Sequence, residues 1–270
     1  MTRDLKSRVG RPSHRDLLEF VEQLPPQKKV LGLTHVTSSY LLRDLIAAGR
    51  IEALEECDVL REPIIYAFYG RAAFRGKSEF EPTTLSSLFP SVLILDPSRV
   101  PRPKYVFPFD SGAFVEGRMD QFLHPYMPLF DFLLTPEPES AAKLVAAVFG
   151  TNDNFLRNVP SPAFNVPAAN FEADAYRKMV LANGGNLSAG LDDRASTPEI
   201  LFSDSIELRT SVTAAVLPDT LAADKNIGGA LRSYGIEISE YVWTSSGRPN
   251  ETHFIVRSLV HEIYKSRGWL

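Results

Sequence analysis

The chain has 270 residues, of which 44% are apolar and 23% charged, and its formal net charge is −4 at pH 7. This is the composition of an ordinary globular protein, and the length favours one domain with insertions over two large domains. The negative charge argues weakly against a broad basic surface for nucleic acid, and the single cysteine, Cys57, excludes an internal disulfide and a cysteine-rich zinc site.

Two observations predict where the protein works. The longest apolar runs, such as residues 91–96 and 141–150, are much shorter than the roughly 20 residues that a membrane-spanning helix requires. The first residues, MTRDLKSRVGRP, are charged and lack the apolar stretch of a secretory signal, so residues 1–12 are expected to form a flexible tail. We therefore expect a cytoplasmic protein that does not associate with membranes.

In the first half of the chain, hydrophobic periodicity and turn residues predict several helices and strands. The clearest helix is 39–48, whose apolar residues recur at helical spacing and which Gly49 ends. The segment IIYAFYG (64–70) is rich in aromatic and β-branched residues, which favour a strand. The other elements expected here are a helix at about 14–23 and strands at 29–36, 91–96 and 104–114, the last with a break at Pro108.

The second half begins with a segment, about 120–190, that resembles an insertion over the core. Many short strands without regular alternation of strand and helix predict an α+β fold with mainly antiparallel sheets, in a single domain of residues 1–270. The elements expected in this half are helices at 138–148 and 171–182, strands at PEILF and SVTAAVLP, a helix ended by Gly235 with a strand after it, and a final strand and helix within 252–267.

Familiar catalytic signatures are absent from the sequence. It contains no P-loop, no GxGxxG and no GxSxG. HEIYK (261–265) differs from the zinc-binding HExxH because Lys265 occupies the place of the second histidine. The histidines have no ligand spacing between them, so we expect no metal site, and we interpret His253 as a strand residue and His261 as a surface helix residue.

Three residues in separate segments form a more informative set. His35 ends the first strand, Tyr66 lies in IIYAFYG, and Glu199 opens a strand in DDRASTPEILF. Each has an ordinary alternative: His35 as a hydrogen-bonded residue at a helix start, Tyr66 as a core residue, and Glu199 as a solvated carboxylate. Their order along the chain, together with the strand and helix around each, favours a shared functional site.

The segments THVTSSYLLRDLIAAGRI, IIYAFYG and STPEILFSDSIELRTSVTAAVLP carry these residues. In this order they resemble the ADP-ribosyltransferase superfamily, in the histidine, tyrosine, glutamate branch that includes the poly-ADP-ribose polymerases, diphtheria-type toxins and DarT toxins. The resemblance covers residues 29–75 and 190–218, under a third of the chain.

The resemblance implies a fold of two small, mainly antiparallel sheets that face each other across a cleft for NAD, with helices around them. NAD would be the substrate, and no metal would be needed. His35 would bind a ribose hydroxyl, Tyr66 would stack on nicotinamide, and Glu199 would be catalytic. Further contacts with NAD are expected from Thr37, Tyr69 and Arg71.

The implied activity is transfer of ADP-ribose from NAD to a macromolecular acceptor, either protein or nucleic acid, inside the cell. A bacterial toxin or antiviral defence effector with an antitoxin partner would have this activity. Thr197 stands two residues before Glu199, where the arginine-modifying branch has a glutamate, so arginine is disfavoured as the acceptor.

Several alternatives stay open at this point. The same fold would serve an NAD glycohydrolase, in which water is the acceptor, or an RNA 2′-phosphotransferase. A catalytically silent nucleotide-binding module and a plain structural or regulatory subunit are rivals from other classes. Additional residues that would suit the cleft are Phe74, Arg75, Arg194 and Ser196, and a loop with Asp110 and Ser111 resembles a binding loop without an assigned role.

Overall fold

The computed structural model of the chain describes residues 17–27, 29–73, 81–184 and 192–270. A seven-stranded sheet with the strand order β5-β6-β3-β1-β4-β8-β9 forms its centre, and β2 and β7 form a separate two-stranded sheet. All paired strands are antiparallel except β8 and β9, which run parallel. The strands are β1 (Leu33–Ser38), β2 (Arg50–Ile51), β3 (Ile65–Tyr69), β4 (Pro90–Leu95), β5 (Tyr105–Phe107), β6 (Glu199–Phe202), β7 (Ile206–Glu207), β8 (Val212–Pro218) and β9 (Glu237–Tyr241).

The expected mixture of helices with mainly antiparallel strands is confirmed, but the expected division into two small facing sheets is corrected. The large sheet is continuous because β1 still pairs with β3, through Leu33 with Tyr69 and Thr34 with Phe68. These two residue pairs are a narrow connection, since β1 pairs with β4 along its whole length, from Leu33 to Ser38. We call the place beyond Thr34, where β1 and β3 part, the seam of the sheet.

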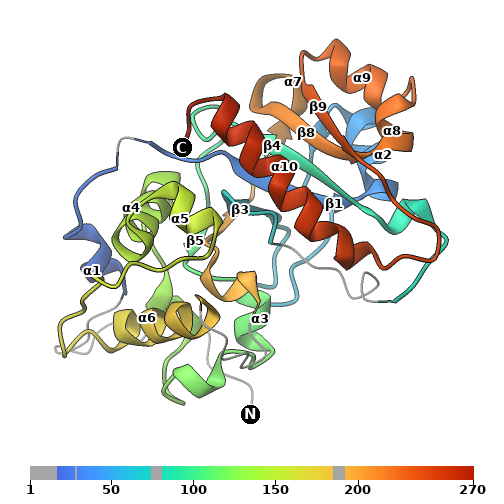
Figure 1. Cartoon of the computed structure of the whole chain (residues 1–270). Coiled ribbons are helices and arrows are strands. Elements are labelled where there is room, and N and C mark those ends of the chain that lie inside the picture. The colour runs from blue at the N-terminus through green and yellow to red at the C-terminus, as the bar shows by residue number, and fades with distance from the viewer. Residues whose placement is uncertain (1–16, 28, 74–80, 185–191) are drawn as a thin grey trace.

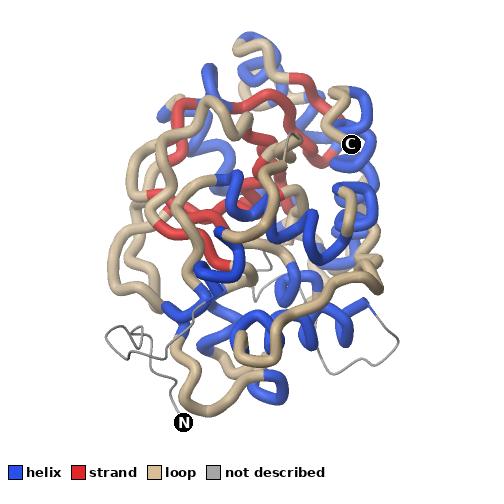
Figure 2. The backbone as a smooth tube through the Cα atoms, turned by 90° about the vertical axis from the view of Figure 1, so that its left-hand side faces the viewer, coloured by secondary structure: helices blue, strands red, loops and turns tan. Residues whose placement is uncertain are grey.

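Helices gather around both parts of the sheet (Figure 1). One group, α1, α3, α4, α5 and α6, lies near β3 and β5, while α2, α8 and α9 lie near β4, β8 and β9, and α10 runs across β8 and β9. Figure 2, turned by 90°, shows helices both beside the strands and below them. The helices are α1 (Leu17–Glu22), α2 (Ser39–Ala48), α3 (Ser111–Val115), α4 (Pro138–Phe149), α5 (Asn152–Leu156), α6 (Phe171–Gly184), α7 (Leu208–Ser211), α8 (Asp219–Ala223), α9 (Gly228–Ser233) and α10 (His253–Ser266).

Local signals at both ends explain why α2 follows β1 directly. The Ser38 side chain accepts a hydrogen bond from the amide of Leu41 at 3.3 Å, which caps the first turn. At the other end Gly49 adopts the left-handed conformation, with φ of 71°, and its amide bonds the carbonyl of Ile46. The predicted helix over 39–48 is confirmed, and it begins directly after the last residue of β1.

One predicted element of the sheet is confirmed in part and another is wrong. The strand expected over 104–114 exists as Tyr105–Phe107 and stops before the expected break at Pro108, but the part after the break is the short helix α3, which Asp110 caps by accepting a hydrogen bond from the amide of Ala113 at 2.7 Å. The strand expected before the C-terminal helix does not exist, and His253 is a buried residue of α10 instead. The sequence there has the helical spacing, since Val256, Val260 and Ile263 are buried on one side.

The predicted helices at 138–148 and 171–182 correspond to α4 and α6. Both lie in the segment 120–184, which packs against β3 and β5 and contributes large buried side chains to the same hydrophobic cluster as the sheet. Helix α1 starts at Leu17, and residues 14–16 of the expected helix and the expected tail at 1–12 lie outside the described residues. No helix within the described ranges has the length and apolar character needed to cross a membrane.

Candidate functional site

His35 lies at the seam and connects the two strands through its side chain. Its Nδ1 is 2.7 Å from the backbone carbonyl oxygen of Tyr66. Because a carbonyl only accepts hydrogen bonds, Nδ1 carries the proton, and in the neutral ring Nε2 is left as an acceptor. Burial lowers the pKa of His35, while the hydrogen bond to the carbonyl partly opposes that effect. The imidazole is therefore held in a defined tautomer between β1 and β3.

Tyr66 and Glu199 share one face of the sheet. The register pairs Phe68 of β3 with Glu199 of β6, and Tyr66 with Leu201. Side chains two residues apart point to the same face, so Tyr66 and Glu199 are diagonal neighbours across the two strands. Consistent with this placement, burial is the largest cause that raises the pKa of the Tyr66 hydroxyl, with contributions from Cys57, Glu199 and Asp110.

Glu199 is a buried carboxyl group at the start of β6, with 1% of its surface exposed. Its Oε2 accepts a hydrogen bond from the backbone amide of Ser111 at 3.1 Å. Burial raises the pKa of Glu199 to about 8, the negative charge of Asp110 raises it further, and hydrogen bonding by Ser111 opposes both. The alternative of a solvated carboxylate at a strand start is thus excluded by the burial, and at neutral pH the protonated form predominates.

Thr37 and Tyr69 occupy different environments from the three residues above. Thr37 lies further along β1, opposite Ser91 of β4, and its side chain is buried. Tyr69 has no exposed surface, and its hydroxyl accepts a hydrogen bond from the amide of Leu31 at 3.0 Å. Its ring packs against Phe155 with 5.9 Å between centroids. The structure places Tyr69 in the core, with its hydroxyl and its ring both in contact with other residues.

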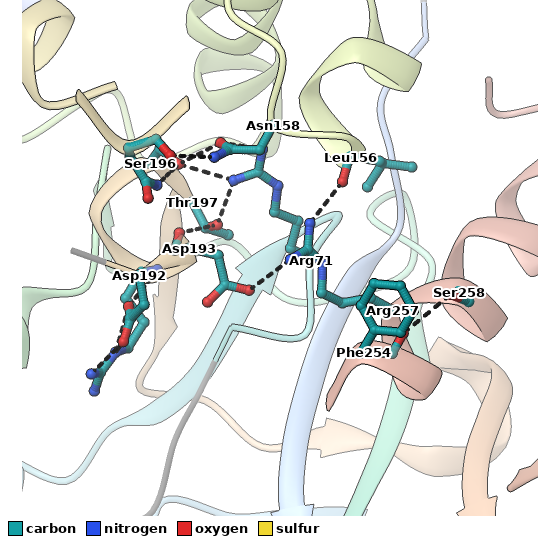
Figure 3. A network of polar contacts seen from close by, with 12 residues as sticks. Arg71, Leu156, Asn158, Asp192, Asp193, Ser196, Thr197, Phe254, Arg257 and Ser258 are labelled. Carbon is teal, nitrogen blue, oxygen red and sulfur yellow. Dashed lines mark hydrogen bonds and ion pairs between the residues drawn. The ribbon is translucent and has the colours of Figure 1, made fainter. Parts of the chain in front are cut away.

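Arg71, expected to contact NAD, is also a core residue, with 1% of its surface exposed (Figure 3). Its Nη1 donates to Ser196 Oγ at 3.0 Å and to Thr197 Oγ1 at 3.2 Å. The other nitrogen, Nη2, donates to the carbonyl of Phe155 and to Asn158 Oδ1, the latter at 3.2 Å. Burial lowers the pKa of Arg71 to about 9, so the guanidinium stays charged at neutral pH. Arg71 therefore fixes the segment that leads into Glu199.

The residues just before Glu199 hold this segment in place. Arg194 donates to both carboxylate oxygens of Asp192, at 2.9 and 3.0 Å from Nε. Ser196 is fully buried and accepts from Arg71. From α10, Arg257 reaches Asp193 at 4.0 Å and donates to the carbonyl of Leu156 at 3.0 Å, as Figure 3 shows. Phe74 and Arg75, also considered for the cleft, lie outside the described residues.

The structure places Tyr66 beside Glu199 across β3 and β6, joins the His35 side chain to the backbone of Tyr66, and adds Asp110 and Ser111, to which the sequence alone gave no role. A local signal for the added pair was present, because Asp followed by small residues is typical of a helix N-cap. Their contact with Glu199 depends on long-range packing that no local pattern contains.

Comparisons of the chain with known protein families, with curated proteins and with solved structures found no match. What the protein does is therefore inferred from the geometry of this site and from the three sequence segments that form it. The chemical features available are a neutral imidazole acceptor, a partly exposed tyrosine ring and a buried pair of carboxyl groups.

Proposed function

We propose that the protein transfers ADP-ribose from NAD to a macromolecular acceptor, protein or nucleic acid, and that His35, Tyr66 and Glu199 form its NAD site. The observation that carries the proposal is the seam, where β1 and β3 part after two residue pairs and the His35 imidazole bonds the Tyr66 carbonyl. Because β1 and β3 separate at the seam, a ligand would be able to enter between these two strands. A toxin or defence effector in the cytoplasm, restrained by an antitoxin, is the biological role that we propose.

His35 would locate the ribose of NAD. Its Nδ1 is committed to the Tyr66 carbonyl, so Nε2 is the nitrogen available to accept a hydrogen bond from a ribose hydroxyl. Burial lowers the pKa of His35 and favours the neutral ring, which has this acceptor. A neutral ring also avoids repulsion with the positively charged nicotinamide.

Tyr66 would supply a flat surface for the nicotinamide ring. It is partly exposed, unlike Tyr69, and belongs to the same strand face as Glu199. Aromatic stacking contributes about 0.5–1.5 kcal/mol beyond the burial of apolar area. The same placement would hold the bond between nicotinamide and ribose close to the carboxyl group of Glu199.

Glu199 would act on the ribose in its ionised form. The bond from C1′ to the nicotinamide nitrogen breaks with its electron pair going to nicotinamide, which leaves as a neutral molecule. Positive charge then develops on the ribose, and a carboxylate stabilises it and binds the 2′-hydroxyl. An oxygen or nitrogen of the acceptor forms the new bond to C1′ and loses its proton to the solvent. Because 1% of Glu199 is exposed, NAD has to displace neighbouring side chains to reach it.

The test is release of nicotinamide from NAD by the purified chain, with and without cell lysate. Glu199→Gln keeps the shape of the side chain and removes its charge, and Glu207→Gln, on an exposed residue of β7, is the matched control. Release that requires lysate and disappears only in Glu199→Gln would support the transferase and lead to the labelled acceptor.

Other outcomes separate the rival functions. Release without lysate would identify a glycohydrolase, and removal of the phosphate from a 2′-phosphorylated RNA would identify the phosphotransferase. If neither variant nor wild type releases nicotinamide, while NAD still binds, the protein is a nucleotide-binding module. Absence of both release and NAD binding would refute the proposal.

A further inference from the structure

Two carboxyl groups, those of Asp110 and Glu199, meet at the start of α3. Glu199 Oε2 accepts a hydrogen bond from the amide of the peptide bond that joins Asp110 to Ser111, at 3.1 Å. Asp110 Oδ1 accepts from the amide of Ala113, three residues further on, at 2.7 Å. The exposed fractions of Asp110 and Glu199 are 9% and 1%. Both groups are therefore held against one turn of backbone and away from water.

Positive charge does not neutralise this pair directly. The charge of Arg194 lowers the pKa of Asp110, but the Arg194 guanidinium is itself bound by Asp192, at 2.7 Å from Nη2, and the charge of Asp192 raises the pKa of Asp110. Among the residues that the structure describes, no lysine or arginine forms a hydrogen bond or ion pair with Asp110 or Glu199. From the adjoining strands, β3 presents the neutral hydroxyl of Tyr66 and β5 presents the apolar Phe107 opposite Glu199.

Two buried carboxylates that form no ion pair repel each other strongly, and such pairs retain a proton. We propose that Asp110 and Glu199 share one proton at neutral pH, and that Asp110 is a positioning residue whose charge sets the pH range in which Glu199 is ionised. The effect of this pair on catalysis rests on the proposed function, whereas the sharing of the proton does not.

The electrostatics of both groups agree with this geometry. Burial is the largest cause that raises the pKa of Asp110 and of Glu199, and the charge of Asp110 raises the pKa of Glu199 further. The ionised form of Glu199 is the one that stabilises a positively charged ribose. Nicotinamide release should therefore increase as the pH rises towards 8 and reach a plateau above it.

Asp110 also has an ordinary structural role as the N-cap of α3, and the test has to separate the two. Asparagine and serine are good N-cap residues that carry no charge. Asp110→Asn and Asp110→Ser therefore retain the helix cap and remove the negative charge that acts on Glu199. Asp224→Asn is the matched control, because Asp224 is exposed and its carboxylate also accepts backbone amides, those of Asn226 and Ile227.

The experiment is a pH titration of ¹³C-labelled glutamate side chains by NMR, with Glu199→Gln to assign the Glu199 signal. We expect a wild-type midpoint near pH 8, lowered by about one pH unit or more in both Asp110 variants and unchanged in Asp224→Asn. The serine variant provides the measurement if the asparagine variant fails to fold. A Glu199 midpoint that is the same in wild type and both Asp110 variants would overturn the proposal.

The second readout is the pH dependence of kcat/KM for nicotinamide release. In the Asp110 variants the rising limb should move to lower pH with an unchanged plateau, a shift that loss of a helix cap alone would not produce. If the NMR midpoint moves and no variant or wild type turns over NAD, the shared proton stands and the proposed function fails. If turnover occurs with no shift in either readout, Asp110 is only a helix cap.

Discussion

Replacing Glu199 with glutamine is expected to make the protein more stable at alkaline pH. The pKa of Glu199 is about 8 in the folded protein and 4.5 for an ordinary glutamate. As the pH rises, the unfolded chain therefore loses the Glu199 proton at a lower pH than the folded protein does. The stability that the protonated carboxyl provides is complete below about pH 4.5 and is lost as the pH rises through 8.

The difference between the two pKa values corresponds to roughly 5 kcal/mol, at about 1.4 kcal/mol for each pKa unit. This free energy is an upper bound, because the raised pKa of Glu199 depends partly on Asp110, whose own protonation adjusts when Glu199 ionises. Glutamine is neutral at every pH, and its amide oxygen can accept the same hydrogen bond from the Ser111 amide. Glu199→Gln should thus equal wild type near pH 4.5 and exceed it increasingly up to pH 8.

Urea denaturation of both proteins at a series of pH values measures this difference. Subtracting the two free energies of unfolding removes the contribution of every other titrating group that the variants share. Glu207→Gln, at an exposed site, should give a flat difference. A flat difference for Glu199→Gln as well would show that Glu199 titrates normally in the folded state, and the reasoning from its burial would be refuted.

Three further substitutions test other parts of the structure. Tyr66→Ala should raise KM for NAD by about two- to thirteen-fold, the equivalent of one stacking interaction, while Tyr66→Phe should not; equal KM values in steady-state kinetics would contradict a stacking role. Arg71→Ala should lower the free energy of unfolding by about 3 kcal/mol or more, because it removes the donor to the buried Thr197 hydroxyl and one of the two donors to Ser196, the other being Asn183. Arg71→Lys should recover only part of this loss in urea melts. Gly49→Ala should cost about 1–2 kcal/mol in the same assay through its φ of 71° alone, since no atom lies within 4 Å of an added Cβ; a stabilised variant would exclude that conformation.

The parts of the fold that the sequence predicts well are those with local causes. Helix α2 has its cap and its stop within the segment itself, at Ser38 and Gly49. The strand at 91–96 was predicted from its apolar run, and in the structure every residue of β4 is buried. The strand expected at the start of 252–267 is wrong, because the spacing of the buried Val256, Val260 and Ile263 is helical and α10 begins at His253.

The candidate site was predictable in its components but not in its contacts. The segments around His35, Tyr66 and Glu199 indicated which residues to consider. They did not indicate that Tyr69 and Arg71 are buried, because the residues that cover them, such as Phe155, are more than eighty positions further along the chain. The pairing of Asp110 with Glu199 has the same origin in distant packing.

The network around Arg71 also bears on how far the protein can be trimmed. This one guanidinium bonds the end of β3 to Phe155 and Asn158 in the middle segment and to Ser196 and Thr197 before β6. In a shortened protein without residues 120–184, the charged Arg71 side chain would face an empty cavity. The strand that begins with Glu199 would also lose one of its supports. The middle segment is therefore not a removable module, and a minimal version of this protein has to retain it.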